Sequence, residues 1–101
     1  MYSKQRIELI IERMAYKRAC RVLEASGLTG YTALPTLGGF GGGNRWQRDT
    51  DISGGSDMVA IIAIGSPERV TKALTDIENI LGAHIGVVSV SDVQVLRGER
   101  F

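Results

Sequence analysis

The chain has 101 residues, of which 44% are apolar and 23% charged, so it fits one globular domain with a modest core and is too hydrophobic to be disordered. Twelve Lys and Arg balance eleven Asp and Glu, which excludes a broad positive field that would gather nucleic acid or an anionic membrane. A single cysteine excludes an intrachain disulfide, and no apolar run approaches the ~20 residues that span a bilayer, so we expect a cytoplasmic protein.

The first third of the chain predicts a strand, a helix and a second strand. In residues 7–11, Ile7, Leu9 and Ile11 fall on one side and alternate with Glu8 and Ile10 on the other. This period of two predicts a strand with one better buried face. Residues 14–26 place apolar side chains at i, i+3, i+4 and i+7, which predicts an amphipathic helix that Gly27 ends. Residues 31–37 predict another strand, and Pro35 within it favours an edge position or a bulge.

Residues 38–55 predict a long loop without regular structure. They hold seven of the thirteen glycines, and a loop of this length in a small domain is usually a functional element. Its glycines let the backbone approach a ligand and offer N–H groups to phosphate, although no P-loop pattern is present. The loop also contains a cationic and aromatic cluster of Arg45, Trp46 and Arg48. Such a cluster is typical of a surface that binds an anion or a partner, although these side chains could equally be exposed to solvent without a binding role.

The second half predicts a buried strand, a helix and a last strand. Residues 58–64 are continuously apolar, as in a central strand covered on both faces. Ser66 is a natural N-cap, Pro67 suits the first helical position, and the helical period continues to Gly82. The valines from 88 to 95 change parity near Ser91, which predicts a bulge or two short strands.

The order is therefore strand, helix, strand, long loop, strand, helix, strand. This order predicts an α+β, ferredoxin-like βαββαβ domain over residues 1–101, with an antiparallel sheet and both helices on one face.

The residues with chemical side chains do not assemble a catalytic or metal centre. His84 is the one histidine and has no neighbouring cysteine or carboxylate cluster, so we expect no metal site. Cys20 lies on the apolar face of the first helix, so we expect it to pack as a small apolar residue rather than act as a nucleophile. Arg97 and Arg100 can grip phosphate or carboxylate oxygens, although such arginines are more often solvated surface residues. We expect a protein that is not an enzyme and carries no cofactor.

Three short motifs show a resemblance to a known family. The stretch G-L-T-G-Y-T from Gly27 to Thr32, followed by G-G-F-G from Gly38 to Gly41, resembles the segment that leads into the T-loop of PII signal-transduction proteins. The C-terminal L-R-G-E-R-F resembles PII-like proteins associated with bicarbonate uptake and carboxysomes. The resemblance covers essentially the whole chain.

The resemblance implies a homotrimer that binds an adenine nucleotide in clefts between subunits and signals through a T-loop at about residues 38–55. Thr29 would contact the adenine, and Arg97 and Arg100 would reach the phosphates from the C-terminal side. The base of the T-loop, near the phosphates, would be formed by Gly38, Gly39, Phe40 and Gly41. A B-loop stretch would line the cleft with Gly86, Val87 and Val88.

Two departures from the classical PII pattern refine the expected ligand. Residues 38–55 contain no tyrosine, which argues against control by uridylylation. Classical PII proteins carry a B-loop lysine that contacts the triphosphate, whereas residues 82–90 contain no lysine. The loss of this contact would weaken ATP binding by about 1.5–3 kcal/mol. We therefore expect AMP or ADP rather than ATP, with bicarbonate as a second ligand.

The mode of signalling is our own hypothesis. Nucleotide and bicarbonate would order the loop and so present or withdraw Arg45, Trp46 and Arg48. The recipient would be a protein partner, such as an inorganic-carbon transporter or a carboxysome component.

Three other functions fit the same fold. The first is a trimeric metal-ion tolerance protein, against which the lone His84 and Cys20 argue. The second is an RNA-binding module, which would need aromatic residues at the centre of the sheet. The third is a small enzyme, for which the sequence shows no catalytic residues.

Overall fold

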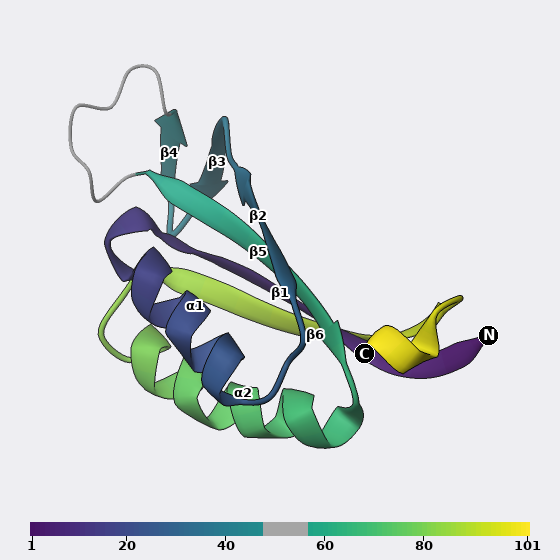
Figure 1. The fold of residues 1–101 in the computed structure, drawn as a ribbon. Coiled ribbons are helices and arrows are strands. Elements are labelled where there is room, and N and C mark those ends of the chain that lie inside the picture. The colour runs from purple at the N-terminus through teal and green to yellow at the C-terminus, as the bar shows by residue number, and fades with distance from the viewer. Residues whose placement is uncertain (48–56) are drawn as a thin grey trace.

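The computed structural model describes residues 1–47 and 57–101 (Figure 1). A four-stranded antiparallel sheet carries two helices on one face, and a separate two-stranded hairpin stands beyond one end of it. The main-sheet strands are β1 (Tyr2–Glu12), β2 (Tyr31–Pro35), β5 (Met58–Gly65) and β6 (Gly86–Val95). The helices are α1 (Tyr16–Ala25) and α2 (Pro67–Leu81), and the hairpin consists of β3 (Gly38–Gly41) and β4 (Asn44–Gln47). This architecture confirms the predicted ferredoxin-like fold.

The strand order in the main sheet is β2-β5-β1-β6, with every neighbouring pair antiparallel. The apolar strand β5 is central, as its sequence predicts. β2, which ends at Pro35, is an edge strand, so the missing N–H of proline removes no ladder hydrogen bond on the outer side.

The core lies between the sheet and the two helices. Ile7, Leu9 and Ile11 alternate along β1 and are at most 1% exposed, because the period of a strand turns all three to the helix side. The facing residues on β5 and the helices are Ile61, Ala63, Ala19, Cys20, Leu23, Val70, Ala73, Ile77 and Ile80. These are the apolar positions from which the strand and helix periods were predicted.

Local signals set the ends of both helices. Ser66 Oγ accepts a hydrogen bond from the Arg69 backbone N–H, and Pro67 follows at the first helical position. α1 ends shortly before Gly27, whose φ of +85° is a conformation that L side chains rarely adopt. Within the described ranges, neither helix is long and apolar enough to cross a membrane.

The predicted bulge near Ser91 is wrong. β6 pairs with β1 without interruption from Tyr2↔Val95 to Ile11↔Gly86. β6 is an edge strand whose residues are largely exposed or half-buried, so burial does not force its valines onto one face. The change of parity in the sequence therefore reflects weak burial on both faces rather than a break in pairing.

The other face of the main sheet has no helix over it (Figure 1). Register places Leu34, Ala60, Ile10 and Val87 in one row across this face. Leu34 is 44% and Val87 59% exposed, and Ala60 and Ile10 are half-buried. A row of aliphatic side chains in this state is typical of a face that another protein surface covers.

Candidate functional site

The predicted adenine residue and the C-terminal arginines lie at one end of the main sheet. Thr29 is in the connection between α1 and β2, and its hydroxyl donates a hydrogen bond to the Arg100 carbonyl oxygen. Arg97 directly precedes the 3₁₀ turn Gly98–Arg100 that follows β6, and Arg100 is the last residue of that turn. The structure thus brings Thr29 to the same end of the sheet as two arginines that lie about 70 positions further along the chain.

Close packing holds this C-terminal turn in place. Gly98 is buried, and a Cβ atom there would overlap the ring of Tyr2 on β1. The side chains of Arg97 and Arg100 are exposed, and neither forms an ion pair within residues 1–47 and 57–101. Two uncompensated guanidinium groups on a fixed turn are well suited to bind phosphate oxygens.

The predicted phosphate loop lies at the opposite end of β2 (Figure 1). Gly38, Gly39, Phe40 and Gly41 form β3, which pairs with β4 so that Phe40 faces Arg45 and Gly39 faces Trp46. The prediction of an unstructured loop is therefore wrong for residues 38–47. Phe40 is 72% exposed, and Arg45 is exposed as well.

Two glycines explain the hairpin. Gly42 and Gly43 have φ of +58° and +82°, the paired positive values of a two-residue type I′ turn. The G-G-G-N sequence was the available signal for this turn. Arg48 and the rest of the predicted loop to residue 55 lie outside the described residues, as does the side chain of Trp46.

The predicted B-loop residues are part of a strand. Gly86, Val87 and Val88 begin β6 and pair with Ile11, Ile10 and Leu9 of β1. The connection between α2 and β6 is residues 82–85, which end at the hairpin end of the sheet (Figure 1). The three residues therefore lie at the same end of the sheet as the hairpin, on the first rungs of an edge strand.

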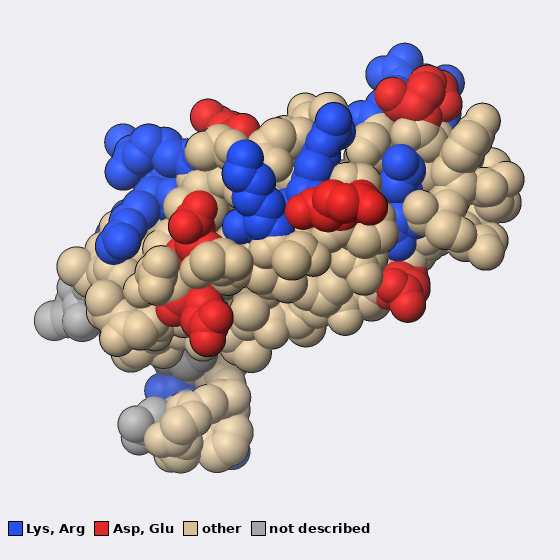
Figure 2. Space-filling model, turned by 90° about the horizontal axis from the view of Figure 1, so that it is seen from below, with Lys and Arg blue, Asp and Glu red and all other residues tan. Residues whose placement is uncertain are grey.

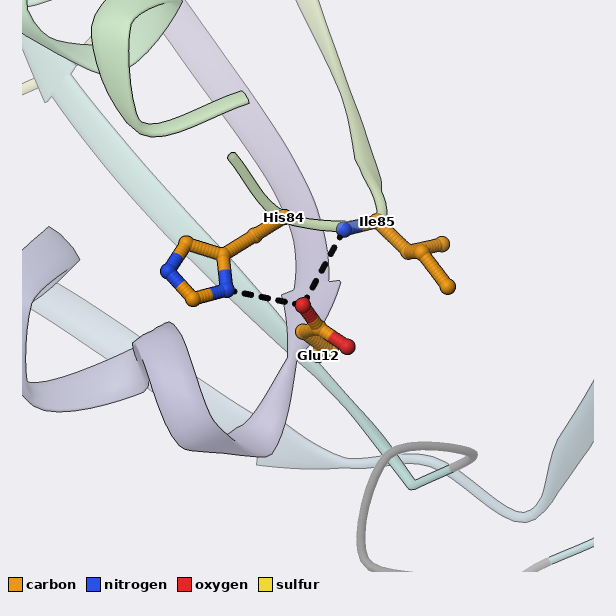
Figure 3. Close-up of polar contacts among 3 residues, drawn as sticks. All are labelled: Glu12, His84 and Ile85. Atoms are coloured by element: carbon orange, nitrogen blue, oxygen red, sulfur yellow. Dashed lines mark hydrogen bonds and ion pairs between the residues drawn. The ribbon is translucent and has the colours of Figure 1, made fainter. Parts of the chain in front are cut away.

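A buried carboxylate that the sequence analysis missed fixes the 82–85 connection (Figure 3). Glu12 Oε1 lies 2.8 Å from His84 Nδ1 and accepts the Ile85 backbone N–H at 3.2 Å. An ionised carboxylate can only accept, which places the imidazole proton on Nδ1. The Glu12 backbone N–H in turn donates to the Ile85 carbonyl at 3.0 Å. An acidic residue at the end of an apolar strand was the one sequence signal for this contact.

Arg13, the next residue, contacts Asp57, which lies directly before β5. The Arg13 backbone N–H donates to the Asp57 carbonyl at 2.9 Å, and Arg13 Nε lies 3.4 Å from Asp57 Oδ2. Glu12 and Arg13 together therefore hold the starts of both β5 and β6 to the end of β1. This junction sets the spacing between residues 82–85 and the point where the chain re-enters the sheet.

Tyr31, the first residue of β2, connects this strand to α1. Its hydroxyl donates to Glu24 Oε2 at 2.8 Å. Hydrogen bonds with the Cys20 thiol and then with Glu24 raise the pKa of Tyr31 well above its usual value, because both interactions favour the neutral phenol. Cys20 is 7% exposed and packs as a small apolar residue, as predicted.

The two groups of predicted site residues are too far apart to share one nucleotide within a single chain. β6 has ten residues, which corresponds to about 33 Å between Gly86 and the C-terminal turn at the usual strand rise. The chain measures 42 Å along its longest axis. A hollow of about 390 Å³ lined by residues such as Lys4, Pro67 and Asp92 contains none of the predicted nucleotide residues.

Comparison with known proteins identifies the family. The family model for nitrogen regulatory protein P-II matches residues 4–100. The chain belongs to the P-II family. Among curated proteins, no sequence matches it.

Solved structures of P-II-like proteins are similar over nearly the whole chain. CPII, a nitrogen regulatory PII-like protein from Thiomonas intermedia bound to ADP, AMP and bicarbonate, has 30% identity and a TM-score of 0.89, covering 99% of this chain and 94% of CPII. CPII bound to ADP and bicarbonate has 31% identity and a TM-score of 0.87, with 99% and 95% covered. A PII-like signalling protein from Thermus thermophilus has the same fold at 24% identity, with a TM-score of 0.80 and 98% and 95% covered.

The close pairing of Gly86 in this P-II chain leads to a stability prediction. A Cβ atom at Gly86 would lie 2.8 Å from the Ile10 carbonyl oxygen and 3.2 Å from Ile11 Cα, both backbone atoms of the central strand. Gly86→Ala should therefore lower the free energy of unfolding by about 1–3 kcal/mol, as overpacking does elsewhere. Urea denaturation measures this loss.

Gly30→Ala is the matched control for that experiment. A Cβ atom at Gly30 meets no atom within 4 Å, and its φ is not positive. We expect this variant to be as stable as the parent or more stable by up to about 1 kcal/mol, because alanine restricts the unfolded chain. Equal losses in the two variants would show that backbone contact at Gly86 is not the cause.

Proposed function

We propose that this P-II protein is a trimeric sensor that binds AMP or ADP between neighbouring subunits, together with bicarbonate. The observation that carries the proposal is the separation of the predicted site into two halves at opposite ends of a 42 Å molecule. Thr29, Arg97 and Arg100 form one half, and residues 38–41 with 86–88 form the other. Each half becomes part of a complete site when a second copy brings its opposite end alongside.

The open face of the sheet supports assembly into a trimer. The aliphatic row of Leu34, Ala60, Ile10 and Val87 would be buried if copies packed sheet to sheet around a common axis. The helices would then remain on the outside. Light scattering of the purified protein, with a mass three times that of the chain, is the expected result.

The ligand chemistry is supported by both the sequence and the similar structures. CPII, at 30% identity, binds ADP, AMP and bicarbonate. The absence of lysine from residues 82–90 favours a short phosphate tail over a triphosphate, and the two exposed C-terminal arginines are available to bind that tail. No cofactor beyond these regulatory ligands enters the proposal.

The loop is the proposed output of the sensor. Nucleotide at the Gly38–Gly41 backbone would bias the hairpin and the loop to residue 55, and so change how Arg45, Trp46 and Arg48 meet a partner. The proposed partner is a protein of inorganic-carbon metabolism. The role is therefore regulatory rather than catalytic, and the single buried Cys20 suits a reducing cytoplasm.

Calorimetric titration with AMP, ADP and ATP, each with and without bicarbonate, tests the proposal. We expect saturable binding of AMP and ADP that bicarbonate strengthens, and ATP binding that is weaker by about tenfold or more. Silence with all three nucleotides would refute the sensor. A titration with divalent metal ions in the same instrument tests the metal-tolerance alternative, for which His84 is already engaged with Glu12.

A further inference from the structure

The outer face of α1 and the turn before it carries a stripe of basic side chains. Arg13, Lys17, Arg18 and Arg21 are all exposed. Figure 2 views the molecule from the side of the two helices; blue side chains lie at its left, the side on which α1 begins in Figure 1, and others lie across its middle and right, among red ones. We call these four residues the α1 stripe.

The α1 stripe concentrates charge in a chain that is otherwise slightly acidic. Residues 13–25 hold four basic residues and one acidic residue, a net charge of +3. The remainder of the chain holds eight basic and ten acidic residues, a net charge of −2. The near-neutral total therefore hides a local positive surface on α1, which can attract an anion at short range.

This arrangement works against the stability of the helix. The first turn of α1 has no acidic residue, and its N-cap, Ala15, makes no side-chain hydrogen bond. Lys17 and Arg18 instead place positive charge at the positive end of the helix dipole. Arg21 also has like charges at both i−3 and i−4, which is unfavourable on a helix surface. Charges kept at a cost to local stability point to binding rather than to folding.

Among the described residues, only Arg13 of the stripe has an acidic partner. Arg13 pairs with Asp57, but Lys17, Arg18 and Arg21 have no ion pair within residues 1–47 and 57–101. Glu24, the one acidic residue of α1, accepts a hydrogen bond from Tyr31 instead. The stripe lies on the helix side of the sheet, so it would stay accessible if the open sheet face were buried in a trimer.

We propose that the α1 stripe docks an acidic segment of a partner protein. Three of its four residues are arginines, whose forked donors fit carboxylate pairs. Residues 16–25 expose charged side chains on α1 rather than the large apolar side chains that a helix needs in order to lie in a membrane surface, and the one large apolar side chain beside the stripe is Met14, which is 72% exposed in the turn before α1. This surface is separate from the hairpin, so the inference goes beyond the proposed nucleotide function.

The stripe also contacts Asp57, the residue before β5. Arg13 Nε lies 3.4 Å from Asp57 Oδ2, at the point where the loop re-enters β5. A carboxylate of the partner competes with Asp57 for Arg13. Docking on α1 is therefore linked to Asp57, the residue before β5, through one shared guanidinium group.

Titration of the isotope-labelled full-length protein, followed by backbone amide shifts in NMR spectra, tests the proposal. The probe is a short synthetic peptide that alternates glutamate and serine, and its control has glutamine in place of glutamate. We expect the glutamate peptide at low salt to shift the amides of residues 13–21, and the glutamine peptide to leave them unchanged. Shifts confined to other elements, or none at millimolar peptide, would overturn the proposal.

Charge reversal locates the binding surface. The double variant Lys17→Glu/Arg21→Glu should bind the glutamate peptide about tenfold more weakly, because two attractive contacts become repulsive. The matched control, Arg69→Glu/Lys72→Glu, makes the same charge change on exposed positions of α2 and should bind as the parent does. Equal weakening in both variants would mean that only total charge matters, which would contradict the proposal.

Nucleotide titration and vesicle co-sedimentation distinguish docking of a protein segment from nucleotide binding and from membrane binding. Both double variants should bind ADP as the parent does. If the parent protein itself does not bind ADP, the nucleotide proposal fails, but the peptide titration still tests docking on the α1 stripe. Co-sedimentation with phosphatidylserine vesicles, in the absence of any peptide-dependent shift, would assign the stripe to a membrane and overturn docking of a protein segment.

Lys17→Glu alone should raise the Tm by about 2–4 °C, because it removes the unfavourable charge from the first turn.

Discussion

Removing both C-terminal guanidinium groups, in the variant Arg97→Ala/Arg100→Ala, is expected to weaken ADP binding by about a hundredfold or more. Both side chains are exposed beside the turn that Gly98 and Thr29 hold in place. Each charge-assisted contact with a phosphate contributes about 1.5–3 kcal/mol, and every 1.4 kcal/mol is a factor of ten. Calorimetric titration with ADP in the presence of bicarbonate measures the loss.

A second arginine pair provides the control. Arg18→Ala/Arg21→Ala removes the same number of charges from the exposed face of α1 and should leave ADP affinity unchanged. Equal losses in the two double variants would show that the effect comes from the overall charge. Unchanged affinity in Arg97→Ala/Arg100→Ala would contradict the proposed C-terminal half of the site.

Mixing damaged subunits tests whether the site lies between copies. Gly41→Asp places a negative charge in the other half of the site, and a Cβ atom at Gly41 meets no atom within 4 Å, so the fold should tolerate it. Trimers of either variant alone should bind ADP weakly. Co-expressed mixed trimers should regain one intact site, where a subunit with a normal hairpin end meets one with a normal C-terminal end. Mixed trimers that bind no better than either parent variant would refute a shared site.

Leu9→Ala is expected to lower the free energy of unfolding by about 2–5 kcal/mol. Leu9 is 0% exposed on the central strand β1, where its neighbours in register are Ile61 and Val88. Truncation leaves a cavity between the sheet and the helices that surrounding side chains fill only in part. Chemical denaturation at fixed protein concentration measures the loss, since oligomer stability depends on concentration.

Leu96→Ala is the matched control, because Leu96 is 81% exposed after β6. Its expected effect is within about 0.5 kcal/mol. A loss at Leu9 no larger than the loss at Leu96 would mean that the core does not pack as the structure shows.

Much of the fold was predictable because the core imposes regular spacing on the sequence. Residues 7–11, 58–64 and both helices showed the correct periods, since each of these elements turns one face to the same core. The hairpin of β3 and β4 was missed because it buries little, so its signal was a glycine turn rather than a hydrophobic pattern. The parity of β6 misled for a related reason, because an edge strand with weak burial does not sort its residues by face.

The candidate site was predictable only in its parts. Thr29 and Arg100 could be named from local motifs, but only the fold shows that they meet. Gly86 to Val88 were assigned to a B-loop stretch from the family resemblance, whereas the register places them in β6 against β1. Glu12 and His84 are 72 residues apart, and no local pattern reports a contact between them.

By itself, the sequence determined the fold class, the helix ends and the absence of an intrachain disulfide, because periodicity, capping and cysteine count are local properties. Only the tertiary structure decided which residues share an end of the sheet, since strand order and register set distances between segments far apart in the chain. It also separated the predicted nucleotide residues into two groups, because a ten-residue strand holds the C-terminal turn and residue 86 about 33 Å apart.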